Sequence, residues 1–285
     1  MLDYSNIDIN YEDLDKFCID YKNDEAFNLT IYKKNIKYEF IIKLKQTSQK
    51  MLVLGSGAYD MTKLSPPIYN RIGWINDFDC NLIYYNDPTL YFRGINLGWA
   101  YGDKDTHYAK EISDIISVLL RKLNIKNEDT YFYGSSGGGF ISIMLATMIK
   151  NSTAIANNSQ TSIIKYFKVY VDRLFSTIYG EYDEKIIEEN KYRISLVDCM
   201  KKYNNVPRIY FLQNMAYEYD VINHVITFIQ DLQYIVHREN IHFIFYHDEI
   251  AGHDPISKRD TINLINSVMN NNNIEILDIP NINKK

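Results

Sequence analysis

The stretch YFYGSSGGGFISIMLATMIK, residues 131–150, concentrates glycine more than any other part of the chain. Four of the 12 glycines and two serines fill residues 134–139, between a run of aromatic residues and a long apolar run. Aromatic residues favour a strand and the apolar run favours a helix, so the glycines lie where a strand turns into a helix. This density of glycine indicates a turn in which two stretches of backbone pass close to each other.

Gly134, Ser136 and Gly138 fit the pattern G-x-S-x-G of a nucleophile elbow. In that turn a serine is held in a strained conformation, and glycines flank it because larger side chains would collide. The pattern predicts Ser136 as a nucleophile and the backbone N–H of Gly137 as one donor to an oxyanion. Two alternatives are a glycine-rich turn without chemistry and a phosphate-binding loop, although such a loop favours lysine after its glycines and Phe140 follows here.

A serine becomes a good nucleophile only when a base takes its proton. The loop EIAGHDPIS places His253 next to Gly252, after the last expected strand and before the last expected helix, where an elbow enzyme carries its base. We therefore predict His253 as the base. The remaining histidines end or flank a strand, lie in a helix or precede the elbow: His107, His224, His237, His242 and His247.

The base needs an acid to orient it, and that acid is expected after the preceding strand. The strand PRIYFLQ, residues 207–213, is followed by the loop NMAYEYD. Asp220 is the predicted acid, Glu218 is the second choice, and Asp248 and Asp254 are weaker alternatives. The resulting order along the chain, serine then acid then histidine, is the order found in α/β-hydrolases.

A second oxyanion donor is expected from the loop after an early strand. The run MLVLGSG, residues 51–57, is apolar and ends in small residues, as a buried parallel strand does where it meets a loop. Small residues allow a backbone N–H to approach a substrate oxygen, so Gly57 or Ala58 is the predicted donor. The alternative is a turn that only ends the strand.

Strand and helix patterns alternate from residue 51 onward, which predicts a parallel sheet covered by helices on both faces. Expected strands are 51–57, 80–87, 130–135, 153–156, 207–213 and 241–247, and expected helices are 106–123, 141–149, 221–236 and 256–269. A hairpin is expected at 26–30 and 38–44, and the first 20 residues are expected to pack loosely.

The chain is expected to be a single α/β-hydrolase domain, residues 1–285. Residues 157–205 interrupt the alternation with polar, mainly helical sequence, which predicts a cap over the carboxyl edge of the sheet. Residues 271–285 carry little pattern and are expected to form a flexible tail.

Composition excludes several classes of partner. The formal net charge of −5 and a pI near 5.7 provide no basic surface for nucleic acid or an anionic membrane. No leader-like amino terminus or long apolar run is present, so we expect a cytoplasmic protein. Cys18, Cys80 and Cys199 are odd in number and widely spaced, so we expect no disulfide framework and no metal site.

Four segments together resemble α/β-hydrolase-fold proteins of bacterial surface-polysaccharide loci, the capsular polysaccharide O-acetyltransferases. They are YFYGSSGGGFISIMLA, STAIANNSQTSIIKYF, PRIYFLQNMAYEYD and AGHDP, within residues 51–270. The resemblance implies that Ser136, Asp220 and His253 form a catalytic triad and that Gln160 faces the pocket. The acid loop differs, because NMAYEYD replaces a glycine-containing turn. The resemblance also implies acetyl-CoA as acyl donor and a polysaccharide as acceptor.

Three functions remain open from the sequence. The first is an O-acetyltransferase that moves an acetyl group through acetyl-Ser136 to a sugar hydroxyl, and the second is a serine esterase that uses water instead. The third is a non-catalytic protein of glycan assembly that keeps the elbow as scaffold. The segment ANNSQTS offers Asn158 and Gln160 as contacts to sugar hydroxyls.

Overall fold

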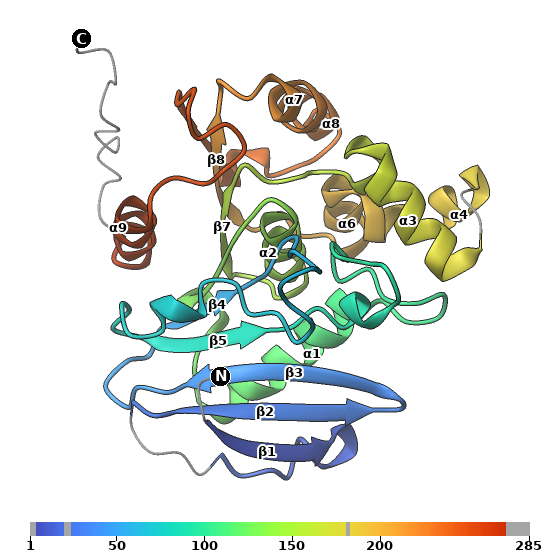
Figure 1. Cartoon of the computed structure of the whole chain (residues 1–285). Helices are drawn as coiled ribbons and strands as arrows, with labels where there is room; N and C mark the ends of the chain where they lie inside the picture. Colours follow the sequence, from blue (N-terminus) through green and yellow to red (C-terminus); the bar gives the residue numbers. More distant parts are fainter. Residues whose placement is uncertain (1–3, 20–23, 181–182, 272–285) are drawn as a thin grey trace.

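The computed structural model describes residues 4–19, 24–180 and 183–271, and within them the strands form one nine-stranded sheet (Figure 1). The order across the sheet is β1-β2-β3-β5-β4-β6-β7-β8-β9. The strands are β1 Ser5–Asn10, β2 Ala26–Lys33, β3 Ile36–Lys43, β4 Met51–Leu54, β5 Asn81–Tyr85, β6 Thr130–Ser135, β7 Thr153–Asn157, β8 Arg208–Asn214 and β9 Ile241–Tyr246.

The helices follow the strands as the alternation predicts. They are α1 Tyr108–Lys122, α2 Gly137–Met148, α3 Lys168–Tyr179, α4 Glu184–Glu189, α5 Lys191–Ile194, α6 Leu196–Tyr203, α7 Glu218–Asp220, the π-helix η6 Val221–Ile226, α8 Thr227–Leu232 and α9 Lys258–Met269. Short 3₁₀ helices are η1 Tyr11–Asp13, η2 Ile72–Trp74, η3 Pro88–Tyr91, η4 Asn127–Asp129, η5 Ile163–Lys165 and η7 Arg238–Asn240.

Strands β4 to β9 all run parallel, and β3 joins them antiparallel to β5. In this register Val53 of β4 lies between Ile83 of β5 and Phe132 of β6. The carboxyl ends of the parallel strands therefore meet at one edge of the sheet, which is where open α/β sheets bind their ligands.

Helices cover both faces of the sheet, as expected for strands that are apolar throughout (Figure 1). On one face α1, α2 and α6 bury side chains such as Ile112, Met144 and Met200 against the sheet. On the other face α9 packs Leu264 and Val268 against the tyrosines of β6. The α/β prediction is confirmed, including the helix that follows the glycine cluster.

The amino-terminal residues differ from the prediction of loose packing. Residues 5–10 form β1, which pairs in parallel with β2 and widens the sheet at that end. Leu14 is buried just after it. This strand has little pattern in the sequence, because only Ile7 and Ile9 are apolar in it and its other side chains are polar.

Two helical segments also differ from their expected bounds. The helix expected at 221–236 begins earlier, with α7 at Glu218, continues as the π-helical η6 and as α8, and ends at Leu232. The segment 157–205 contains α3 to α6 and connects β7 to β8. Of these helices, α6 packs against α2. The segment's role as a cap stays a prediction, and the tail expected at 271–285 lies outside the described residues except for Asn271.

No helix among the residues that the structure describes is long and apolar enough to cross a membrane. Of the three cysteines, Cys80 and Cys199 are buried and Cys18 is exposed.

Gly134 provides a test of how tightly the elbow is packed. A Cβ atom at this position would lie 2.3 Å from the carbonyl carbon and oxygen of Gly138. Because backbone would have to move, we expect Gly134→Ala to lower the free energy of unfolding by about 1–3 kcal/mol. Gly73→Ala is the matched control, since a Cβ atom there meets no atom within 4 Å. Urea unfolding measures both, and equal stability of the two variants would contradict the packing argument.

His224 of η6 is fully buried, and burial, with the nearby His253 as a smaller cause, lowers its pKa from 6.5 to about 3. Between pH 6.5 and about pH 3, His224 is therefore protonated in the unfolded chain and neutral in the folded chain. We expect the free energy of unfolding to fall as pH decreases below 6.5, by up to about 1.4 kcal/mol per pH unit from this group.

His224→Gln removes that titration and should reduce the difference in unfolding free energy between pH 7 and pH 5. The exposed His242→Gln is the control and should leave the difference unchanged. A difference that is the same in all three proteins would show that His224 is not held neutral.

Candidate active site

The elbow lies at the carboxyl end of β6, near the middle of the sheet. Ser136 has φ 55° and ψ −129°, between the last residue of β6 and the first residue of α2. Non-glycine residues rarely adopt positive φ, and the neighbouring backbone maintains it here. The Ser136 N–H donates to the Asn157 carbonyl at 3.1 Å, and its carbonyl accepts from Gly139 N–H at 3.0 Å and Phe140 N–H at 3.2 Å.

Three side chains that are far apart in the sequence form one hydrogen-bonded row. His253 Nε2 lies 2.9 Å from Ser136 Oγ, and His253 Nδ1 lies 2.5 Å from Asp220 Oδ2. The Asp220 side chain is 1% exposed, whereas that of His253 is 28% exposed. The buried carboxylate therefore fixes the ring, while the other ring nitrogen remains beside the serine at an accessible position.

The predicted oxyanion donors come from two segments that lie against each other. A Cβ atom at Gly57 would be 3.7 Å from Gly137 N and 3.6 Å from Gly138 N, so the loop after β4 lies against the start of α2. Gly57 is buried, and Ala58, the alternative donor, is exposed. In the described part of the chain the N–H groups of Gly57, Ala58 and Gly137 donate to no protein acceptor.

Gln160 contacts the serine itself. Its Nε2 donates to Ser136 Oγ at 2.8 Å, and its Oε1 accepts from Trp99 Nε1 at 3.1 Å. Gln160 and Trp99 are both fully buried. An indole N–H can only donate, so it takes the amide oxygen of Gln160. The amide nitrogen is therefore the end that faces Ser136 and donates to it.

Trp99, which was not predicted from the sequence, lies in a stretch of left-handed backbone. Both Trp99 and Ala100 have positive φ, 51° and 50°. The buried Asp87 accepts from Ala100 N–H and Thr89 N–H at 2.8 Å each, and burial raises its pKa while these bonds oppose the rise. No sequence pattern marks Trp99, since nothing in its neighbours requires an indole N–H.

Asn158 has a different set of partners from the sugar hydroxyls that the sequence suggested. Its Nδ2 donates to the backbone carbonyls of His253 and Asp254 at 3.0 and 2.9 Å, and its Oδ1 accepts from Asn214 N–H at 2.8 Å. The residue is fully buried. Its amide is therefore occupied in holding the histidine loop.

The other acids considered from the sequence have other positions. Glu218 and Asp254 are exposed, and neither forms a hydrogen bond with His253 in the described residues. Asp248 accepts from Ile250 N–H and Ala251 N–H and so shapes the loop that carries His253. Within the described residues, Ser136 Oγ forms its hydrogen bonds with Gln160 and His253 and with no other histidine.

The two sides of the serine differ in chemistry. Next to His253 lies Tyr217, with ring centres 5.5 Å apart, and Tyr219 stacks on Phe167 at 4.1 Å. On the side of Ser135, Arg71 Nη2 donates to Ser135 Oγ at 2.6 Å. The guanidinium of Arg71 also lies over the ring of Tyr133, 5.2 Å from its centre. Arg71 was not predicted from the sequence, because it lies in a loop without a motif.

Comparisons of the whole chain with known proteins give a fold but no close relative. No protein-family model and no curated protein matches the sequence. Among solved structures, the capsule O-acetyltransferase of Neisseria meningitidis serogroup A superposes with a TM-score of 0.62 at 17% identity, covering 84% of this chain and 96% of that one.

Two serine hydrolases superpose over a similar length. FphF, a fluorophosphonate-binding serine hydrolase of Staphylococcus aureus, has a TM-score of 0.55 at 15% identity and covers 87% of this chain and 99% of its own. An S-formylglutathione hydrolase from Agrobacterium tumefaciens has a TM-score of 0.55 at 10% identity and covers 88% and 94%. The chain thus has the α/β-hydrolase fold.

Proposed function

We propose that this protein is a serine-dependent acyltransferase that acts on carbohydrate. The observation that carries the proposal is the row Ser136, His253 and Asp220, with 2.9 and 2.5 Å between successive partners. These distances are within hydrogen-bond reach, and the acid is buried behind the base as nucleophilic catalysis requires.

In the first half-reaction Ser136 Oγ attacks the carbonyl carbon of an acyl donor while His253 Nε2 takes the serine proton. The negative charge that develops on the carbonyl oxygen is stabilised by the N–H groups of Gly137 and of Gly57 or Ala58. The bond to the leaving group then breaks, and His253 returns the proton to that group. Asp220 holds the ring in the tautomer that presents Nε2 as acceptor.

In the second half-reaction an acceptor hydroxyl loses its proton to His253 Nε2 and attacks the acyl carbon. The bond between that carbon and Ser136 Oγ then breaks, and His253 returns the proton to Oγ. For an acetyltransferase the donor is acetyl-CoA and the acceptor is a sugar hydroxyl. Tyr217 lies beside His253, and the half-buried Tyr219 stacks on the exposed Phe167. These rings support a sugar, because the apolar face of a sugar ring packs on aromatic rings. The meningococcal capsule O-acetyltransferase, which also has a CoA-bound structure, supports the same pair of substrates.

Hydrolysis of acylated sugars or small esters is the second candidate. The observation in its favour is that the His253 side chain is 28% exposed, which admits water to the acyl-serine. Incubating the pure protein with acetyl-CoA, with and without capsular or other surface polysaccharides, separates the candidates. Acetylated polysaccharide indicates transfer, and release of acetate alone indicates hydrolysis. The absence of both products would contradict the proposal of an enzyme of this kind.

Ser136→Ala tests the nucleophile. Since Oγ forms the covalent intermediate, we expect turnover to fall by about 10⁶-fold while the fold stays intact. Ser135→Ala is the matched control and should cost far less, because its hydroxyl contacts Arg71 and not His253. Mass spectrometry after treatment with a fluorophosphonate should find the adduct on Ser136, and an adduct on Ser135 would reverse the assignment.

We propose that Gln160 positions the serine, as its bonds to Ser136 Oγ and Trp99 Nε1 support, whereas the sequence suggested that it binds the acceptor. Without the Trp99 indole N–H the Gln160 amide is free to turn its oxygen toward Ser136 Oγ. The serine would then donate its proton to that oxygen instead of to His253.

Trp99→Phe should therefore lower kcat roughly tenfold, a barrier increase of about 1.4 kcal/mol, with little change in KM. Gln160→Ala should slow both half-reactions, because Oγ is the attacking atom in one and the leaving atom in the other. Trp74→Phe is the control, since Trp74 forms no hydrogen bond with Gln160. If Gln160→Ala slows only transfer to the sugar, Gln160 contacts the acceptor instead.

A further inference from the structure

Arg71 is held at the edge of the active site by one hydrogen bond and two aromatic rings. Its Nη2 donates to Ser135 Oγ at 2.6 Å. Its Cζ lies 5.2 Å from the ring centre of Tyr133 and 5.3 Å from that of Trp74, within the range of cation–π interaction. Ser135 directly precedes Ser136, and consecutive Cα atoms are about 3.8 Å apart. The guanidinium is therefore anchored one residue away from the nucleophile.

The backbone of Arg71 is strained and fixed by its neighbours. Arg71 has φ 66° and ψ 17°, in the left-handed region that non-glycine residues rarely adopt. Just before it, Asn70 N–H donates to Ser56 Oγ at 2.9 Å, and that hydroxyl donates to the Ile68 carbonyl at 3.1 Å. Ser56 directly precedes Gly57, a predicted oxyanion donor. The loop of Arg71 is thus tied to the loop of the predicted oxyanion donors, and strain of this kind is often found at ligand sites.

The charge of Arg71 has no carboxylate partner among the residues that the structure describes. Every aspartate of the segment between β4 and β5, residues 55–80, is paired with a lysine, and the segment contains no glutamate. The pairs are Asp60 with Lys63, Asp77 with Lys258, and Asp79 with Lys45. The positive charge of Arg71 is therefore available to an anion from outside the chain.

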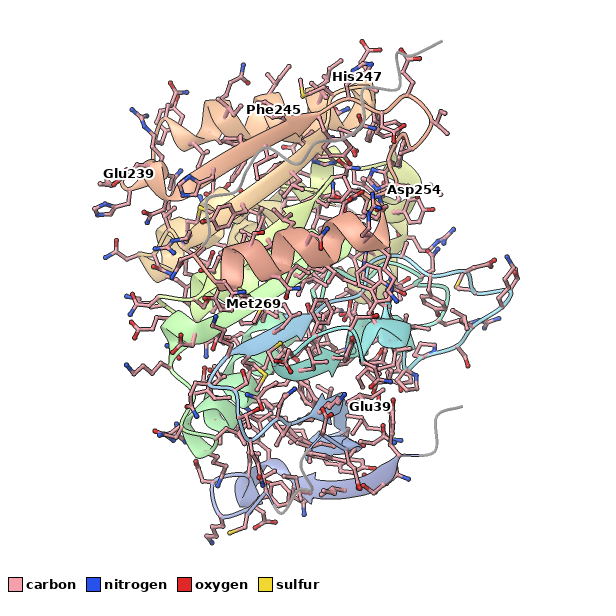
Figure 2. The ribbon with its side chains drawn as sticks, turned by 90° about the vertical axis from the view of Figure 1, so that its left-hand side faces the viewer. Glu39, Glu239, Phe245, His247, Asp254 and Met269 are labelled. Atoms are coloured by element: carbon pink, nitrogen blue, oxygen red, sulfur yellow. The ribbon has the colours of Figure 1, made fainter. Side chains whose placement is uncertain are left out.

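The guanidinium also keeps donors free for a ligand. Within the described chain it forms one hydrogen bond, and none of its nitrogen atoms is both buried and without a partner. Its other N–H groups therefore reach solvent. Figure 2 shows the segment between β4 and β5, in pale blue and cyan, at the same edge of the sheet as His247 and Asp254. That edge carries the loop of His253, so the free donors lie where substrate meets Ser136.

Given an acyl-serine intermediate, as the proposed function requires, we propose that Arg71 binds a carboxylate or phosphate on the alcohol part of the substrate. In transfer that part is the acceptor sugar, and in hydrolysis it is the leaving group. In both cases its hydroxyl oxygen exchanges a proton with His253 Nε2. Arg71 thereby selects an acidic sugar over a neutral one. A planar guanidinium suits this role, since its paired N–H groups match the oxygens of a carboxylate or phosphate.

The phosphates of CoA are another source of negative charge. The pantetheine arm separates them from the thioester carbonyl that Ser136 attacks. Arg71, in contrast, is anchored through the residue next to Ser136. An anion bound by Arg71 therefore lies close to the reacting carbon, which favours the alcohol part of the substrate over the phosphates of the donor.

Three acetate esters that differ in charge test the proposal on the full chain. Phenyl acetate is neutral, 4-acetoxybenzoate carries a carboxylate, and 4-acetoxyphenyl phosphate carries a phosphate. We expect Arg71→Gln to lower kcat/KM for the two anionic esters about tenfold or more relative to phenyl acetate, because a charge-assisted hydrogen bond is lost. Comparing the same esters on two proteins cancels their intrinsic reactivities. Arg71→Lys keeps the charge and should retain part of the preference.

Arg208→Gln is the matched control. Arg208 is exposed at the first residue of β8, at the opposite edge of the sheet from Ser136. The substitution removes the same charge as Arg71→Gln and should leave kcat/KM for all three esters unchanged.

An equal loss for the three esters in Arg71→Gln would show that Arg71 only holds its loop, and would overturn the proposal. A loss with acetyl-CoA that is not seen with S-acetylpantetheine, which lacks the phosphates, would overturn it too, because the anion would belong to the donor. Failure of the proposed function looks different. In that case the unmodified protein would hydrolyse none of the esters, and a fluorophosphonate would leave Ser136 unlabelled.

Discussion

The strained backbone of Ser136 is the constraint on which the rest of the site depends. A residue with φ 55° and ψ −129° costs about 1–3 kcal/mol relative to a relaxed conformation. The strain persists because β6 and α2 are both fixed in the core and because Gly134 and Gly138 leave room for the turn. The same strain directs Oγ out of the sheet edge, toward the ring of His253. Thus the glycines provide the geometry of the nucleophile, and the packing of the sheet provides the free energy that maintains it.

The base is held by a second set of forces, which are polar and buried. Asn157, Asn158 and Asn214 lie at or just beyond the carboxyl ends of β7 and β8, and their amides bind the backbone of the loop at residues 248–256. Buried amides are costly unless their hydrogen bonds are satisfied, and here the loop supplies the partners. The serine and the histidine are therefore positioned by different means, strain and packing for one and side-chain amides for the other.

The sequence predicted the fold and the row of three side chains because each rests on local pattern. G-x-S-x-G between a strand and a helix is read within ten residues, and the positions of Asp220 and His253 follow from the order of the later strands. Trp99, Arg71 and the amide network could not be found in this way. Their roles arise from contacts across 34 to 99 positions of sequence, as in the bonds of Asn214 to Asp248 and of Asn157 to Ile256. Strand β1 was missed since its edge position leaves only two apolar residues.

The way in which the histidine loop is held has a consequence for how its sequence can vary. The asparagine amides donate to the main-chain carbonyls of Asp248, Gly252, His253 and Asp254. Main-chain carbonyls are present whatever side chains the loop carries. Between these anchor points Ile250 is 86% exposed. The tip of the loop is thus a natural place for insertions or grafted peptides, where the chain can gain new surface next to its reactive centre without disturbing the histidine.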